Sequence, residues 1–209
     1  MDRFDIRYHR YLVDPELMDL PRAIIRRFDD WVSKLAHVEP FSDDPQCVMR
    51  IQVGSAAHTL ELAGGSVLKG GKILILHLWN QRLPLIPPQG ADLNYAVKLH
   101  RLMIASLKAV ARYIQNEPSL HDVQAVGGIT AHVSLSDHDG GSAMLRHLGF
   151  TLFPYYRPAG QFGEFWENFY TWWLMWTYNP ATTRARSMFK LQRTEFWTSA
   201  VNFLDKYAR

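Results

Sequence analysis

The stretch that decides the fold reads AVGGITAHV at residues 125–133 and SAMLRHLGFTLF at residues 142–153. The first segment is an apolar run that predicts a buried strand, and the second predicts a short helix followed by another strand. Gly149 comes directly after the helical pattern, at a position where a left-handed glycine ends many helices. Phe150 follows it, and we expect this ring to anchor the turn in a hydrophobic core.

The residues before this stretch alternate between strand-like and helical patterns. Asp92 is a good N-cap for a long amphipathic helix over residues 92–114. A Pro- and Gly-rich loop at residues 80–91 separates this helix from the strand before it. Strands that alternate with helices favour an α/β fold with some parallel pairing. Strands are predicted over residues 47–53, 58–62, 72–79, 125–133 and 151–155.

Both ends of the chain are predicted to be helical. The segment from Phe165 to Tyr178 holds eight aromatic residues in fourteen positions, so a helix there is apolar nearly all round. Residues 1–40 are predicted to be helical, with one apolar face formed by Leu20, Ile24, Ile25, Phe28, Val32 and Leu35. A final helix is predicted from Met188, Leu191, Trp197, Val201 and Leu204. The predicted organisation is an α/β domain of residues 1–156 and an aromatic-rich helical region of residues 157–209.

Composition excludes several classes of protein. The chain has 209 residues and is 47% hydrophobic, so it can form a sizeable core. A net charge of +3 does not indicate a nucleic-acid partner, and the single Cys47 excludes an intramolecular disulfide. The N-terminus lacks a signal-peptide pattern, and no stretch approaches the roughly 20 apolar residues of a spanning helix. We therefore expect a cytoplasmic protein, with contact to a membrane surface left open.

A glycine-rich segment carries a first resemblance to a known family. Residues 60–80 read LELAGGSVLKGGKILILHLWN, which is a strand, a tight Gly turn, a Lys-Gly turn and a strand that ends in a polar element. This pattern resembles the YkoP-like family. That family includes domains attached to polysaccharide deacetylases, so the resemblance implies envelope glycan or lipid chemistry.

The order of elements from residue 72 to residue 155 carries a second resemblance. It is similar to the GNAT acyltransferases, which implies a mixed sheet of GNAT-like order, acyl-CoA as cofactor and an amine or envelope-related substrate. In that fold the pyrophosphate of CoA lies on backbone N–H groups where the long helix begins. The resemblance therefore implies cofactor contacts from Arg82, Gln89, Gly90 and Ala91. The loop departs from the family pattern, because it contains Pro87 and Pro88 and leads into the acidic Asp92.

Candidate catalytic residues lie around the same loop. His77 and Asn80 come at the carboxyl end of a predicted strand, where polar side chains often form a site, and His100 lies on the following helix. In this hypothesis His77 acts as a general base. The position of the GNAT general acid is occupied by Leu145, which cannot transfer a proton. The residues leave open a degenerate domain that binds a small-molecule or lipid-like ligand without chemistry.

Two further segments have open alternatives. The aromatic helix could pack in the core, form a homodimer, or contact a membrane surface through Trp172, Trp173 and Trp176. Basic residues follow it in the sequence. The Asp137-His138-Asp139 triplet is interpreted as a polar loop, and no metal is expected. A basic strip on the long helix, from Lys98 to Arg112, is interpreted as a solvated face, with docking of anionic partners as the alternative.

Overall fold

A five-stranded mixed sheet runs through the centre of the molecule, in the order β1-β4-β5-β7-β6. The computed structural model describes residues 15–87, 89–132, 140–156, 160–180 and 191–209. The strands of the sheet are β1 (Met49–Ser55), β4 (Lys72–Leu78), β5 (Ala125–His132), β6 (Thr151–Pro154) and β7 (Gln192–Ser199). The β4–β5 pair is parallel, and the other three pairs are antiparallel. The α/β class and the mixed sheet predicted from the sequence are confirmed.

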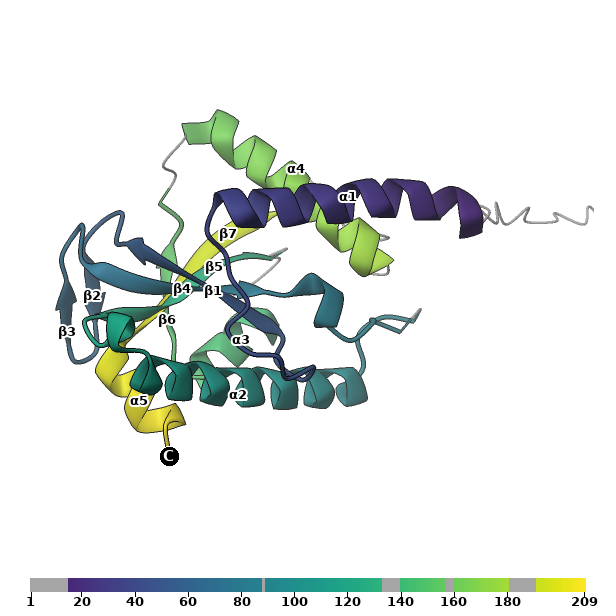
Figure 1. Cartoon of the computed structure of the whole chain (residues 1–209). Coiled ribbons are helices and arrows are strands. Elements are labelled where there is room, and N and C mark those ends of the chain that lie inside the picture. The colour runs from purple at the N-terminus through teal and green to yellow at the C-terminus, as the bar shows by residue number, and fades with distance from the viewer. Residues whose placement is uncertain (1–14, 88, 133–139, 157–159, 181–190) are drawn as a thin grey trace, which may run out of the picture.

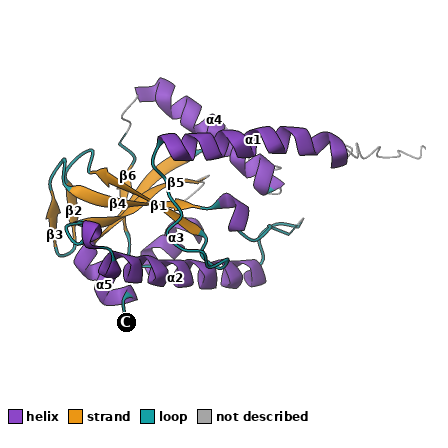
Figure 2. Cartoon of the chain, in the orientation of Figure 1, coloured by secondary structure: helices purple, strands orange, loops and turns teal. Residues whose placement is uncertain are grey.

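Helices cover both faces of the sheet, as Figure 1 and Figure 2 show. One face carries α2 (Leu93–Asn116), α3 (Gly140–His147) and α5 (Ala200–Tyr207). The opposite face carries α1 (Pro15–Leu35) and the aromatic-rich α4 (Gly160–Tyr178). A small hairpin of β2 (Leu60–Leu62) and β3 (Gly65–Val67) lies at one end of the sheet. The structure also contains two short 3-10 helices, η1 (Asn80–Arg82) and η2 (Pro118–Leu120).

The main core lies between the sheet and the α2 side. Leu74 and Val126 of the central strands are fully buried against Leu107 and Val110 of α2 and against Phe203 of α5. A smaller cluster forms on the other face, where Trp197 of β7 packs against the β2–β3 hairpin. The two clusters follow from the alternation of side chains along each strand, which sends neighbouring residues to opposite faces.

The Leu-Gly-Phe turn forms as the sequence predicts. Gly149 has a φ of +91°, in the left-handed region, and its N–H bonds to the Arg146 carbonyl. Phe150 is 4% exposed and meets the Phe196 ring edge-on, with 5.1 Å between centroids. The turn therefore ends α3 and fixes β6 to the core at the same time. The predicted N-cap of the long helix is also confirmed, since the Asp92 carboxylate accepts a hydrogen bond of 2.7 Å from the Tyr95 N–H.

The predicted final helix is wrong over residues 192–199, and Met188, with which it was predicted to begin, lies outside the described residues. Residues 192–199 form β7, which lies between β5 and β6 and bonds to both. Only α5 is helical, and it begins after Ser199, whose hydroxyl caps the Asn202 N–H. The apolar residues from Trp197 to Leu204, which were predicted to belong to one helix, lie first in a strand and then in a helix. Val201, one of the apolar residues of the predicted helix, is 69% exposed. Aromatic and β-branched side chains suit a strand that is bonded on both edges.

Of the residues predicted to be helical at the N-terminus, 15–35 form α1 and 1–14 lie outside the described ranges, and the buried face of α1 is not the predicted one. Ile25 is buried as expected, whereas the other buried side chains on α1 include the polar Asp29 and Ser33. These two polar groups are bonded to side chains of the sheet and of α4, which lowers the cost of burying them. The predicted face therefore points largely outward, with more than 40% exposure at Leu20, Ile24, Phe28 and Leu35.

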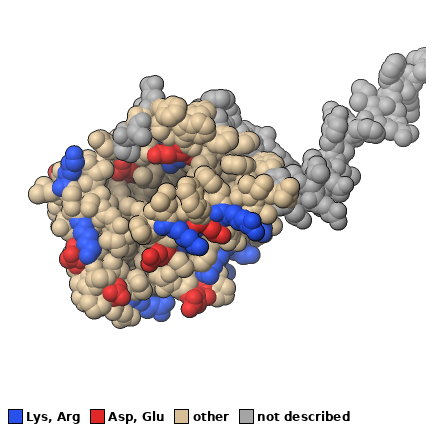
Figure 3. All heavy atoms as spheres, turned by 45° about the horizontal axis from the view of Figure 1, so that its top comes forward, with Lys and Arg blue, Asp and Glu red and all other residues tan. Residues whose placement is uncertain are grey.

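The outer surface mixes charges of both signs. Figure 3 shows the α1 and α4 side turned toward the viewer, where acidic and basic side chains lie singly or in small mixed groups between wide uncharged areas. On α2, Lys98, Arg101, Lys108 and Arg112 are exposed, in agreement with the predicted solvated face. Within the described residues, no helix combines the length and the apolar character that a membrane crossing requires.

Candidate functional site

The two parallel strands of the sheet separate at their carboxyl ends. Their pairing covers Ile73 with Ala125, Leu74 with Val126 and Ile75 with Gly127, and it stops there although both strands continue. Beyond this point β4 stays bonded to β1, and β5 stays bonded to β7. A gap therefore opens in the middle of the sheet, at the strand ends where α/β proteins commonly bind ligands.

Two glycines set the point at which the strands part. A Cβ at Gly128 would lie 2.6 Å from the carbonyl oxygen of Leu76. A Cβ at Gly127 would overlap the carbonyl oxygen of Phe196 on the other neighbouring strand. Only glycine permits this close approach of three strands just before the gap.

A cavity of about 520 Å³ fills the gap, and its walls come from both sheet faces and four helices. Its volume lies within the roughly 300–1,000 Å³ of typical small-molecule sites. Most lining residues are apolar, among them Leu76, Leu99, Met103, Met144, Leu145, Leu174 and Phe196. The polar lining residues lie mainly on the side of α1 and α4, and they form two clusters.

The first cluster is centred on Arg50 of β1. Its Nη1 donates a 2.8 Å hydrogen bond to the Ser33 hydroxyl, and its Nη2 lies 3.6 Å from the Asp29 carboxylate. The Tyr170 hydroxyl donates a 2.6 Å hydrogen bond to the other carboxylate oxygen, and burial followed by this bond raises the pKa of Tyr170. The Nε of Arg50 is buried without an acceptor in the described part of the chain. A buried guanidinium in this state can still donate to a ligand.

The second cluster joins α4 to β7. Arg193 donates from Nε to Asn168 at 3.0 Å and from Nη2 to Thr171 at 2.9 Å, and its Nε lies 3.4 Å from the Glu167 carboxylate. The Tyr155 hydroxyl donates a 2.6 Å hydrogen bond to Glu167. Burial first, and this bond second, raise the pKa of Tyr155. Both acidic groups of the cavity thus have a basic partner and a tyrosine donor.

His77, which the sequence analysis proposed as a general base, lines the cavity beside the first cluster. Burial lowers the pKa of His77 to about 4, and the positive charge of Arg50 acts in the same direction. The imidazole is therefore neutral at pH 7. Its Nε2 lies 2.9 Å from the Gln52 amide oxygen, so we assign the proton to Nε2 and leave a lone pair on Nδ1. A ring with this pKa is a hydrogen-bonding group and only a weak base.

The other predicted site residues do not all reach the cavity. Asn80 lines it, whereas His100 lies outside the lining and pairs with the His147 ring at 5.6 Å between centroids. Arg82 donates to the carbonyls of Asp44 and Cys47 and stacks on Trp79, with its guanidinium carbon 3.7 Å from the ring centroid. Its contacts are those of a structural residue.

The predicted phosphate loop lies outside the cavity as well. Gln89, Gly90 and Ala91 are not among the lining residues, and the Gly90 N–H is bonded to the Pro87 carbonyl. At the start of α2 the Asp92 carboxylate already occupies one N–H donor and brings a negative charge. This helix start is therefore a poor place for the pyrophosphate of CoA.

The polar clusters could hardly be predicted from sequence patterns. Asp29, Arg50, Glu167, Tyr170 and Arg193 come from four separate elements and meet only in the folded chain. One available signal was the pair Asp29 and Ser33, which lie four residues apart on a single side of α1. No group of three or more histidine, cysteine or acidic side chains in the described ranges is arranged to hold a metal ion. The Asp137-His138-Asp139 triplet falls outside those ranges.

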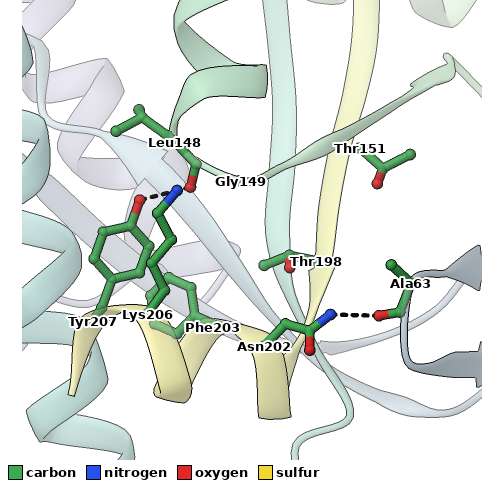
Figure 4. A pocket seen from close by; sticks show the side chains of 9 residues that line it. All are labelled: Ala63, Leu148, Gly149, Thr151, Thr198, Asn202, Phe203, Lys206 and Tyr207. Atoms are coloured by element: carbon green, nitrogen blue, oxygen red, sulfur yellow. Dashed lines mark hydrogen bonds between the residues drawn. The ribbon is translucent and has the colours of Figure 1, made fainter. Parts of the chain in front are cut away.

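A second, smaller cavity of about 190 Å³ lies between α3, α5 and the β2–β3 hairpin, and Figure 4 shows its lining. Three of its polar side chains bind backbone carbonyls. Lys206 donates to His147 at 2.9 Å, Tyr207 to Leu148 at 2.6 Å and Asn202 to Ala63 at 2.6 Å. The first two bonds satisfy carbonyls at the end of α3, so this cavity lies at a structural joint.

Comparison with known proteins identifies one family. The model of the YkoP domain matches residues 20–207, which is nearly the whole described chain. Comparison with curated proteins gave no match, and comparison with solved structures gave none either. Among the described residues, the match spans the sheet, most of α1, the helices α2 to α5 and both polar clusters. The chain therefore belongs to the YkoP domain family.

Proposed function

We propose that this YkoP domain binds a small amphiphile in the cavity between β4 and β5, as a relative of acyltransferases that does not depend on acyl-CoA. The observation that carries the proposal is the cavity itself, which has apolar walls and a few buried polar groups at the carboxyl ends of parallel strands. Sites of this composition take ligands with a hydrocarbon part and a few hydrogen-bonding groups. A relation to the GNAT fold is supported by the order from β4 through α2, β5 and α3 to β6.

Acyl transfer from CoA is the less favoured form of this proposal. Leu145 is 7% exposed and lines the cavity at the position where the GNAT resemblance expects a proton donor. The start of α2 carries Asp92 where a phosphate is expected. The geometry thus supports a binding pocket for the hydrocarbon part and gives little support to the nucleotide part.

Native mass spectrometry tests the proposal directly. The purified chain is mixed with octanoyl-CoA and with a set of octyl amphiphiles that differ in head group. We expect that the chain retains at least one octyl amphiphile in a one-to-one complex and that it does not retain octanoyl-CoA. Leu145→Trp fills the apolar part of the cavity and should abolish retention, whereas Leu85→Trp makes the same change at a side chain that is 74% exposed.

Failure of every octyl amphiphile to bind the wild type would refute the proposal. Retention of octanoyl-CoA, with release of CoA when an amine is added, would instead establish the acyltransferase alternative. Equal effects of the two tryptophan substitutions would place the bound ligand outside the cavity.

A second candidate role is contact with a membrane surface or a second subunit. Phe162, Phe165 and Trp166 on α4 are 41–76% exposed and adjoin one another, with ring centroids 5.4–6.2 Å apart. The residues proposed from the sequence for this contact, Trp172, Trp173 and Trp176, are each partly buried. Vesicle co-sedimentation and light scattering of a Phe162→Ser, Trp166→Ser variant test the role, which is refuted if neither lipid binding nor association occurs in the wild type.

A further inference from the structure

The cavity has one half on each face of the sheet, because it passes through the gap between β4 and β5. On the side of α2 and α3 it is lined by the apolar Leu76, Leu99, Met103, Met144, Leu145 and Phe196. Neighbouring side chains of a strand point to opposite faces, so His77 lies in the other half although it follows Leu76. A hydrocarbon chain of a ligand fits the first half, since that half offers little to a polar group.

The half on the side of α1 and α4 carries the charges. Asp29 is paired with Arg50 at 3.6 Å, and Glu167 is paired with Arg193 at 3.4 Å. Two carboxylates thus face two guanidiniums, while His77 is neutral at pH 7. Among the described lining residues, the charges balance to zero.

This balance restricts the head group of a ligand. A charged head group would lose its hydration on entering the cavity, and it would find no unpaired charge of opposite sign there. Its binding would therefore be unfavourable. A neutral head with hydroxyl groups can form hydrogen bonds with the polar side chains that line this half without breaking either ion pair. Arg50 lines the cavity and is 8% exposed, and its buried Nε has no acceptor among the described residues.

We infer that the cavity selects a neutral amphiphile, with a hydroxyl-bearing head group between α1 and α4 and a single hydrocarbon chain between α2 and α3. The inference rests on the proposed function and adds the chemical class and the orientation of the ligand. Sugar and glycerol head groups share this chemistry. Octyl β-glucoside represents the first source and 1-octanoylglycerol the second, so the tighter of these two probes identifies the source.

The test compares probes of equal chain length by isothermal titration calorimetry, below their micellar concentrations. Against the wild type, one of the neutral probes should bind at least about tenfold tighter than octanoate and octyltrimethylammonium, a difference of about 1.4 kcal/mol. Asp29→Asn leaves Arg50 without its carboxylate and preserves an oxygen that can accept from Tyr170. Octanoate should then bind about tenfold tighter than it binds the wild type.

Asp30→Asn is the matched control, because it makes the same change of charge at the next residue, which is exposed. It should leave the order of the probes unchanged. Glu167→Gln gives a second test at the other ion pair, should Asp29→Asn fail to fold, and it should also favour octanoate.

The inference is overturned if octanoate binds the wild type as tightly as the neutral probes, or if Asp30→Asn shifts its affinity as much as Asp29→Asn does. In either case binding that Leu145→Trp abolishes would leave the proposed function standing. Absence of binding by every probe would overturn both.

Discussion

The buried His77 makes the stability of this domain depend on pH in a defined window. The folded chain holds the pKa of His77 at about 4, below the ordinary 6.5, because the ring is buried and faces the charge of Arg50. The unfolded chain therefore takes up a proton as the pH falls below 6.5, while the folded chain stays unprotonated until about pH 4. The contribution of His77 to the free energy of unfolding is largest above pH 6.5 and decreases as the pH falls through the window.

The size of this loss follows from the width of the window. At about 1.4 kcal/mol per pH unit, the interval from 6.5 to about 4 corresponds to roughly 3 kcal/mol. Urea unfolding of the wild type and of His77→Gln, at steps between pH 7 and pH 4, measures it. Glutamine cannot take the proton, so we expect the variant to lose roughly 3 kcal/mol less than the wild type over this range.

Other groups also titrate in the same range, and the difference between the two chains removes their contribution. His121→Gln makes the same replacement at an exposed histidine and should keep the slope of the wild type. Parallel curves for wild type and His77→Gln would refute the reasoning, because they would mean that the folded chain protonates His77 as easily as the unfolded one.

Three further predictions concern stability. Phe150→Ala should lower the free energy of unfolding by about 3–5 kcal/mol through lost burial and a cavity, and a loss no larger than that of the exposed Phe162→Ala would contradict its role in the core. Gly149→Val should cost at least about 1 kcal/mol in a thermal melt, since φ is +91° and a Cβ would lie 3.1 Å from Lys206 Nζ; an unchanged melting temperature would count against this. Ser106→Ala should cost about 1–3 kcal/mol and speed exchange of the Val48 amide, which bonds to the Ser106 hydroxyl at 2.9 Å, and unaltered exchange would argue against that bond.

The parts of the fold that could be predicted are those with local signals. The N-cap at Asp92 and the turn at Gly149 are set by interactions within a few residues, so the sequence near them contains the information. The same holds for the apolar run of β5 and for the periodic face of α2. Strand β7 could not be predicted in this way, because its partners are more than 35 residues away in the chain and its pattern continues into α5.

Two residues proposed for the site from the sequence, His77 and Asn80, line the cavity, whereas the ion pairs beside them were not predicted. His77 and Asn80 follow from the general rule that ligands bind at the carboxyl ends of parallel strands. The ion pairs depend on contacts between distant elements, since Asp29 and Arg50 come from α1 and β1 while Glu167 and Arg193 come from α4 and β7. Pairs of this kind leave no spacing that a sequence pattern can detect.

The position of β7 governs the order in which the sheet can be completed. Strand β7, residues 192–199, inserts between β5 and β6 and pairs with one of them on each edge. During synthesis at a ribosome, the edges of β5 and β6 that later pair with β7 keep unpaired backbone groups until residues 192–199 have been synthesised. Unpaired strand edges can pair with strands of other molecules. Pairing between strands that are far apart in the chain is also slow. A sheet built from sequential hairpins leaves fewer such edges unpaired during synthesis. We therefore expect the nascent domain to depend more than such a sheet on chaperones, or on rapid pairing of β7, to protect the edges of β5 and β6.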